Sequence, residues 1–271
     1  RDRHDLPDAF EVIEELRAGA HLPGREVCIF LDYDGTLTPI VERPEELFST
    51  PRCGSGSLRT AVISGRGLDD LFERIGIDNI FYAASHGFEL RHPSGETTSR
   101  EEAEAAAGKL DALRQALDDE LGAIDGIQLE PKRFGLAVHF RRASADAEPT
   151  VEQAVRGLLE RFPEYTIKTG KKVFEFVPDL DWDKGKALQW ILQNANLGRD
   201  SAYPMFLGDD VTDEDAFRAI DDWGCSIVVG LDGPQNTNAY FILDDVDAVG
   251  VEVPTPEREV DPAESLLDGL V

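Results

Sequence analysis

The chain has 271 residues, of which 41% are hydrophobic, so it is long enough for one large domain or two modest ones with a substantial core. Acidic residues outnumber basic residues by 54 to 27, and the formal charge of −27 argues against a nucleic-acid partner or an anionic membrane surface. No apolar run approaches the ~18 residues of a membrane-spanning helix, and the first twenty residues lack the apolar stretch of a secretory signal.

The first predicted strand ends in a pair of aspartates. After a helical pattern over residues 8–18, the five apolar residues 27–31 have the length and composition of a strand buried on both faces. This run leads directly into Asp32 and Asp34, and then into Gly35. Open α/β sheets carry their ligand-binding residues at the carboxyl ends of strands, which favours a functional carboxylate pair here. The alternative is a structural turn, because Asp-Gly is a common turn dipeptide.

Two more strands follow an irregular crossover that we expect over residues 38–59. Residues 61–63 form a short apolar run that ends in Ser64 and Arg66 and leads into a helical pattern. A hydroxyl and free backbone N–H groups at such a strand end favour an anion site, although an ordinary strand-to-helix cap explains the same residues. Residues 79–85 predict a third strand.

The segment 91–179 has a different pattern, which predicts a small α+β domain inserted into the first. Amphipathic helices are expected over residues 101–121 and 151–162. We therefore assign residues 1–90 and 180–271 to one domain and the inserted segment to another. The expected strand hairpins pair residues 127–132 with 135–141, and residues 165–169 with 171–177.

Strand periodicity gives the inserted sheet one apolar face and one charged face. The apolar face is expected to carry Leu136, Val138, Phe140, Phe174 and Phe176. A charged face is usual where an antiparallel sheet meets solvent, but a large share of the scarce lysines lies on or beside these strands. Mixed donors and acceptors suit a polyhydroxylated ligand, so we interpret this face as a binding surface. Its expected members are Glu130, Lys132, His139, Arg141, Lys171 and Glu175.

After the inserted segment, the pattern of the first domain resumes. Lys184 opens a helical pattern, and residues 203–207 predict a strand that runs into Asp209, Asp210 and Asp213. A second group of carboxylates is therefore expected at a strand end. Two more short strands are predicted at residues 226–229 and 240–243.

Together these strand ends offer carboxylates, a hydroxyl and an ammonium group. Carboxylates from two separate strand ends are the oxygen ligands that Mg²⁺ prefers, and a serine and a lysine remain to hold a phosphoryl group. An aspartate can act as the nucleophile and form an acyl-phosphate. A second aspartate two residues further on can protonate the leaving oxygen and then activate water. The residues thus predict Mg²⁺-dependent phosphoryl transfer.

These segments resemble, in chain order, the four motifs of the haloacid-dehalogenase-like phosphatases. The matching segments are Asp32-Tyr33-Asp34-Gly35-Thr36-Leu37, Ser64-Gly65-Arg66, Lys184-Gly185 and Gly208-Asp209-Asp210-Val211-Thr212-Asp213-Glu214-Asp215. More narrowly, the chain resembles the trehalose-6-phosphate phosphatase family over about residues 25–245. The resemblance implies an α/β fold, namely a Rossmann-like three-layer core with a parallel sheet and an inserted α+β cap domain that selects the substrate.

The resemblance also implies a role for each matched residue. Asp32 would be the nucleophile and Asp34 the general acid and base, while Ser64 and Lys184 would bind phosphate. The implied Mg²⁺ ligands are Asp32, the backbone carbonyl of Asp34, and Asp209. The residues implied to act around these ligands or through water are Asp210 and Asp213. The implied substrate contacts are Arg66, Glu130, Lys132, His139, Arg141, Lys171 and Glu175.

We therefore expect a phosphatase that hydrolyses trehalose 6-phosphate through an aspartyl-phosphate. One alternative keeps this chemistry but changes the substrate to sucrose phosphate or a hexose phosphate. Another is a catalytically inactive module that senses sugar phosphates; such modules usually lack a nucleophile, whereas Asp32 is present here. We expect a cytoplasmic location, because the three cysteines lack metal-ligand spacing and suit a reducing compartment. We also expect the protein to be a monomer. Its expected partner is a small sugar phosphate, with no nucleic acid and no membrane.

Overall fold

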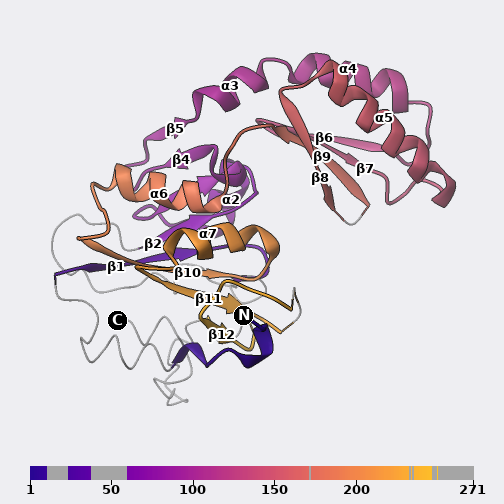
Figure 1. Ribbon diagram of the computed structural model, residues 1–271. Helices are drawn as coiled ribbons and strands as arrows, with labels where there is room; N and C mark the ends of the chain where they lie inside the picture. The colour runs from indigo at the N-terminus through magenta and orange to yellow at the C-terminus, as the bar shows by residue number, and fades with distance from the viewer. Residues whose placement is uncertain are drawn as a thin grey trace, which may run out of the picture. The chain divides into compact units, whose positions relative to one another are not determined.

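The computed structural model describes residues 1–10, 24–37, 60–170, 172–231, 233, 235–245 and 249. It divides into two compact units, each coloured along the chain in Figure 1. The first unit comprises Arg1–Thr98 and Trp182–Val271, and the second comprises Ser99–Asp181. The expected crossover over residues 38–59, and all but the start of the expected helix over residues 8–18, lie outside the described residues.

An eight-stranded sheet forms the centre of the first unit. In sheet order its strands are β12 (Phe241–Leu243), β11 (Cys225–Val229), β10 (Ala202–Gly208), β1 (Glu26–Leu31), β2 (Thr60–Ile63), β3 (Phe81–Ala84), β4 (Glu89–Arg91) and β5 (Thr97–Ser99). From β12 to β3 all neighbours are parallel, whereas β4 pairs antiparallel with β3. The chain runs from β1 toward β3 on one side, and β10 to β12 lie on the other side. Strand order therefore reverses at β1, which is where open α/β sheets bind ligands.

Successive side chains of each strand point to opposite faces of the sheet, so the strands contribute to two hydrophobic cores, one on each face. On β1, Phe30 packs in one core and Leu31 in the other, and neither side chain is exposed to solvent. Such burial on both faces explains the continuous apolar run that predicted this strand. The register pairs Leu31 with Leu207, so the loops that follow β1 and β10 begin at the same level.

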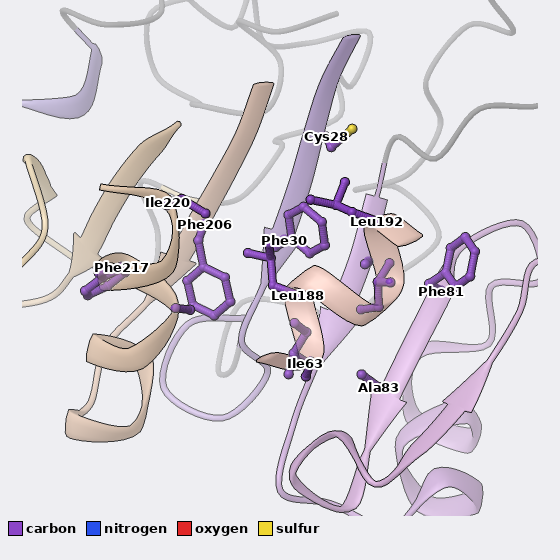
Figure 2. Close-up of a cluster of buried hydrophobic side chains, with 14 of the residues drawn as sticks. Cys28, Phe30, Ile63, Phe81, Ala83, Leu188, Leu192, Phe206, Phe217 and Ile220 are labelled. Atoms are coloured by element: carbon purple, nitrogen blue, oxygen red, sulfur yellow. The ribbon is translucent and has the colours of Figure 1, made fainter. Parts of the chain in front are cut away.

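Helices cover both faces of this sheet, which confirms the predicted three-layer α/β fold. Helix α2 (Leu68–Ile75) packs on one face, while α6 (Lys184–Asn194) and α7 (Glu214–Ile220) pack on the other. Figure 2 shows side chains of α6 and α7 beside Phe30 and Phe206. Short 3₁₀ turns lie at η1 (Arg3–Asp5), η3 (Ser85–Gly87) and η5 (Val211–Asp213).

The second unit has a four-stranded antiparallel sheet with helices against one face. The strand order is β6 (Gln128–Pro131), β7 (Leu136–His139), β9 (Val173–Pro178) and β8 (Tyr165–Gly170). The helices are α3 (Glu101–Ala107), α4 (Leu110–Leu121) and α5 (Glu148–Arg161), with a 3₁₀ turn η4 (Ala145–Ala147). The five residues expected on the apolar face are all buried against α4 and α5, as predicted.

One expected helix of the second unit is two helices. The pattern over residues 101–121 predicts a continuous helix, but α3 ends before Gly108 and α4 begins after Lys109. Glycine is a weak helix former, so a break here costs little. Among the described residues, none of the helices has the length and hydrophobicity that crossing a bilayer requires.

Candidate active site

A buried lysine joins the acidic ends of two strands. Lys184, the first residue of α6, donates hydrogen bonds from Nζ to Asp32 Oδ1 at 2.8 Å and to Asp213 Oδ1 at 2.6 Å. All three side chains are at most 6% exposed. Burial alone would lower the pKa of Lys184, but the charges of Asp32 and Asp213 raise it above its usual value. The lysine therefore stays protonated and neutralises part of the carboxylate charge.

Asp32, Asp209 and Asp213 form a compact carboxylate cluster. One oxygen from each lies within 4.8 Å of the others. Burial, followed by repulsion from Asp213, raises the pKa of Asp209 to about 6. Burial raises the pKa values of Asp32 and Asp213 as well. Three carboxylates with Lys184 between two of them carry more negative charge than the lysine balances, so the cluster can hold a metal ion.

The loop after β1 is shaped around the Asp209 carboxylate. Gly35 has a φ of +90°, and a Cβ built there would overlap that carboxylate, so no larger residue fits. Thr36 Oγ1 donates a hydrogen bond of 3.1 Å to Asp209 Oδ1. Asp34-Gly35 therefore forms a turn and also shapes the site, so the structural interpretation and the functional interpretation of this segment are compatible. Sequence reasoning did not single out Thr36 as a site residue.

Asp213 organises the backbone of the loop after β10. Its Oδ2 accepts the N–H groups of Asp209 at 3.0 Å and Asp210 at 3.1 Å, and its Oδ1 accepts the Lys184 bond. Both oxygens are thus engaged within the protein. Asp210 is exposed and lies outside the three-carboxylate cluster; its Oδ1 accepts the N–H of Thr212 and caps η5.

Arg66 binds both oxygens of the Asp34 carboxylate, which is not part of the three-carboxylate cluster. Its Nε donates to Asp34 Oδ2 at 2.8 Å, and its Nη2 donates to Asp34 Oδ1 at 2.6 Å. The remaining terminal nitrogen, Nη1, donates to Asp70 Oδ2 at 2.8 Å. These hydrogen bonds, those with Asp34 first, raise the pKa of Arg66 above its usual value. The structure therefore places the Asp34 carboxylate on a guanidinium fork.

Ser64 lies at the end of β2, beside β1. The side chain is buried, and its Oγ accepts the Arg66 N–H at 3.2 Å. The N-cap position of α2 is Gly67, which has no side-chain cap bond, so Ser64 forms a turn before the helix and does not cap it. The hydroxyl hydrogen is still able to donate, because accepting one bond does not use it. The turn bond to Arg66 and a phosphate-binding role of Ser64 are therefore compatible.

The charged face of the second unit contains two close acid–base pairs and a pocket. Glu130 Oε2 lies 2.7 Å from His139 Nε2, and Lys132 Nζ donates to Glu175 Oε1 at 2.6 Å. Lys171 lies outside the described residues. A pocket of about 390 Å³ opens on this unit, lined by Gly126, Gln128, Glu130, His139, Arg141 and Arg142.

Sequence reasoning missed three polar residues beside the expected members of this face. Gln128 and Arg142 line the pocket, and the register of β8 and β9 places Lys168 opposite Glu175. Gln128 lies two residues before Glu130 on β6, so the strand period could have identified it.

Comparisons with known proteins agree with this geometry. The profile of the trehalose-phosphatase family matches residues 30–247. The trehalose-phosphate phosphatase of Mycobacterium avium (strain 104) is 40% identical over 285 residues, which cover 100% of this chain and 69% of that protein. The protein of the same name from Mycobacterium tuberculosis (strain ATCC 25618 / H37Rv) is 40% identical over 260 residues, covering 90% and 64%. The chain thus spans about two-thirds of the length of these relatives.

A solved structure extends the comparison to the fold. The trehalose-6-phosphate phosphatase of Aspergillus fumigatus, crystal form 3, has 25% sequence identity and a TM-score of 0.60, and the match covers 89% of this chain and 94% of that chain. The resemblance noted in the four motifs is therefore confirmed by both sequence and structure. With its parallel sheet, its carboxylate cluster and a family match that covers most of its length, the chain belongs to the trehalose-phosphatase family.

Proposed function

We propose that this chain is a Mg²⁺-dependent phosphatase that hydrolyses trehalose 6-phosphate to trehalose and phosphate. The observation that carries the proposal is the buried Asp32 carboxylate, bonded to Lys184 within a three-carboxylate cluster. The names of the relatives support the choice of substrate, because both curated mycobacterial proteins are trehalose-phosphate phosphatases. The reaction class and the substrate therefore have independent support.

Asp32, Asp209 and the backbone carbonyl of Asp34 would hold the metal ion. Oxygen ligands of this kind fit Mg²⁺. Burial, followed by repulsion from Asp213, raises the pKa of Asp209, and a bound cation would offset both effects. Bound Mg²⁺ would neutralise charge on the phosphoryl oxygens and orient them. Asp213 would act around these ligands or through water, because its two oxygens hold Lys184 and the loop backbone in place.

In the first half-reaction the Asp32 carboxylate attacks phosphorus and forms an aspartyl-phosphate, while the bond from phosphorus to the sugar oxygen breaks. Protonated Asp34 gives its proton to that oxygen as the sugar leaves. In the second half-reaction Asp34 takes a proton from water, and the water oxygen attacks phosphorus. Phosphate leaves and the Asp32 carboxylate is restored. Ser64 and Lys184 hold the phosphoryl oxygens, and Arg66 both contacts the substrate and steadies Asp34.

The second unit would act as the cap that selects the sugar. Its charged face offers paired donors and acceptors, and its pocket of about 390 Å³ has the size range of small-molecule sites. Sugar hydroxyls both donate and accept, so they can replace or join the two acid–base pairs. The proposed sugar contacts are Glu130, Lys132, His139, Arg141, Lys171 and Glu175.

Phosphate release from a panel of esters tests the proposal. The panel contains trehalose 6-phosphate, sucrose 6-phosphate, glucose 6-phosphate and an aryl phosphate, each with Mg²⁺ and with chelator. We expect strong preference for the trehalose ester and loss of activity on chelation. Preference for another sugar ester would overturn the assignment of trehalose 6-phosphate as the substrate. No turnover of any ester would favour a catalytically inactive sensing module. Asp32→Asn is the matched inactive control, expected to fold normally and to release no phosphate.

A further inference from the structure

A buried arginine from the start of the chain reaches the backbone of Asp209. Arg3 is 1% exposed, although arginine is rarely buried so completely. It begins the 3₁₀ turn η1, and its backbone N–H donates to the Gln235 carbonyl at 2.7 Å. An antiparallel bridge between Asp2 and Asn236 fixes the same stretch. The position of the Arg3 side chain is therefore set by backbone pairing on the first unit.

Among the described residues, the Arg3 guanidinium makes one hydrogen bond, and that bond goes to the loop of the proposed metal site. Nη2 donates to the Asp209 carbonyl oxygen at 2.8 Å. Nε and Nη1 have no hydrogen-bond partner in the part of the chain that the structure describes. A Cβ built at Gly233 would overlap Nη1, so the path of the side chain requires a glycine there. The guanidinium also interacts electrostatically with the carboxylates of Asp209 and Glu214, so Asp209 meets Arg3 through both its carbonyl and its charge. This double contact points to a role at Asp209.

Asp209 is consequently held at three points. Asp213 Oδ2 accepts its N–H, Thr36 Oγ1 donates to its carboxylate, and Arg3 donates to its carbonyl. The first two contacts belong to the recognised motifs, whereas the third comes from a residue 206 positions earlier. The peptide after Asp209 is held at both ends, because the Asp210 N–H donates to Asp213 Oδ2 and Arg3 donates to the Asp209 carbonyl. Losing the Arg3 bond removes one of these two holds and loosens the orientation of Asp209.

We propose that Arg3 is a positioning residue that orients Asp209 for metal binding. The inference rests on the proposed function, because it takes Asp209 as a metal ligand. Residues that orient metal ligands typically contribute a factor of about 10 to 100 in metal affinity. Arg3 acts through the Asp209 backbone, so substrate affinity at saturating metal is expected to stay unchanged.

Mn²⁺ binding to the substrate-free protein, followed by electron paramagnetic resonance, tests this role. Arg3→Met keeps the side-chain volume but removes the donor, and it should weaken Mn²⁺ binding about tenfold or more. The matched control is Arg1→Met. Arg1 also bonds the neighbouring stretch, donating to the Asn238 carbonyl at 2.6 Å, but has no bond to Asp209. This control should bind Mn²⁺ within twofold of wild type.

Further readouts separate positioning from simple stabilisation. A purely structural role would lower the unfolding temperature of Arg3→Met but leave the Mn²⁺ affinity of the folded protein unchanged, which would overturn the inference. If Arg3→Met does not fold, Arg3→Gln replaces it, because glutamine is shorter and lacks the guanidinium; weaker Mn²⁺ binding by that variant supports the inference and wild-type binding overturns it. Wild-type protein that neither binds Mn²⁺ nor releases phosphate would overturn the proposed function itself, and the inference with it.

Discussion

Lys184 Nζ donates a buried hydrogen bond of 2.8 Å to Asp32 Oδ1, across 152 positions of sequence. The bond ties the first turn of α6 to the end of the central strand β1. It also places a positive charge beside the Asp32 carboxylate, which is the proposed nucleophile. The lysine is therefore part of the fold and of the proposed chemistry at once.

Replacing Lys184 by Met should destabilise the protein markedly. Two buried carboxylates would lose their shared cation, and breaking a buried ion pair from one side typically costs about 3–5 kcal/mol. We expect the free energy of unfolding, measured by urea denaturation at pH 7.5, to fall by about 3 kcal/mol. Lys186→Met, two residues further on, removes a half-exposed partner of Asp183 and should cost less than about 1 kcal/mol. Equal losses in the two variants would contradict the electrostatic role of Lys184.

Replacing Arg66 by Ala should lower kcat/KM for trehalose 6-phosphate by a factor of about 10 to 100, as expected for charge-assisted hydrogen bonds of about 1.5–3 kcal/mol. The reason is that Arg66 holds both oxygens of Asp34. Arg66→Lys keeps the charge but loses the two-pronged contact, so it should restore only part of the activity. Arg74→Ala, which removes another partner of Asp70, serves as the control. Steady-state kinetics showing similar losses for Arg66→Ala and Arg74→Ala would exclude this role.

Metal binding should weaken as the pH falls below 6. The pKa of Asp209 without metal is raised to about 6, so its carboxylate is ionised at pH 7.5 and mostly protonated at pH 5. A proton then competes with the metal, and this group alone should reduce affinity about tenfold between the two pH values. Calorimetric titration with Mg²⁺ at both pH values measures the effect. Affinities that do not differ would contradict the role of Asp209, and Asp209→Asn should lose the part of the pH dependence that Asp209 contributes while keeping the part due to Asp32.

Replacing Glu175 by Gln should raise KM for trehalose 6-phosphate about 5- to 10-fold, because the amide can still hydrogen-bond but loses the charge assistance, a difference of about 1–1.4 kcal/mol. Its carboxylate pairs with Lys132 on the charged face proposed to contact the sugar. KM for an aryl phosphate should not change, because that ester lacks sugar hydroxyls. Arg156→Gln alters an exposed pair with Glu152 on α5 and is the control. An equal rise in KM for both esters would place Glu175 outside sugar recognition.

The site-bearing strands of the first unit were accessible from sequence for a physical reason. Strands buried on both faces read as continuous apolar runs, and parallel strands bring their carboxyl ends to one edge. Asp32, Ser64 and Asp209 each follow such a run, so spacing alone locates them. The match to the trehalose-phosphatase family then came from the motifs themselves.

Other features had no comparable local signal. Strands β4 and β5 are three residues long and extend the sheet beyond β3, so no periodicity marked them, and the sequence suggested only parallel neighbours. The contact between Arg3 and Asp209 depends on a pairing across almost the whole described chain. The break at Gly108 also escaped prediction, because one glycine is tolerated within many helices.

The pairing of β1 with β10 has a consequence for how the chain acquires its structure during synthesis. Glu26 pairs with Ala202, so the two central strands meet only after the whole stretch between them has left the ribosome. The second unit lies entirely within that interval and is built from neighbouring hairpins and helices, so it can fold first. Until β10 arrives, one edge of β1 has no partner strand, which makes this interval the stage most exposed to aggregation and most dependent on chaperones.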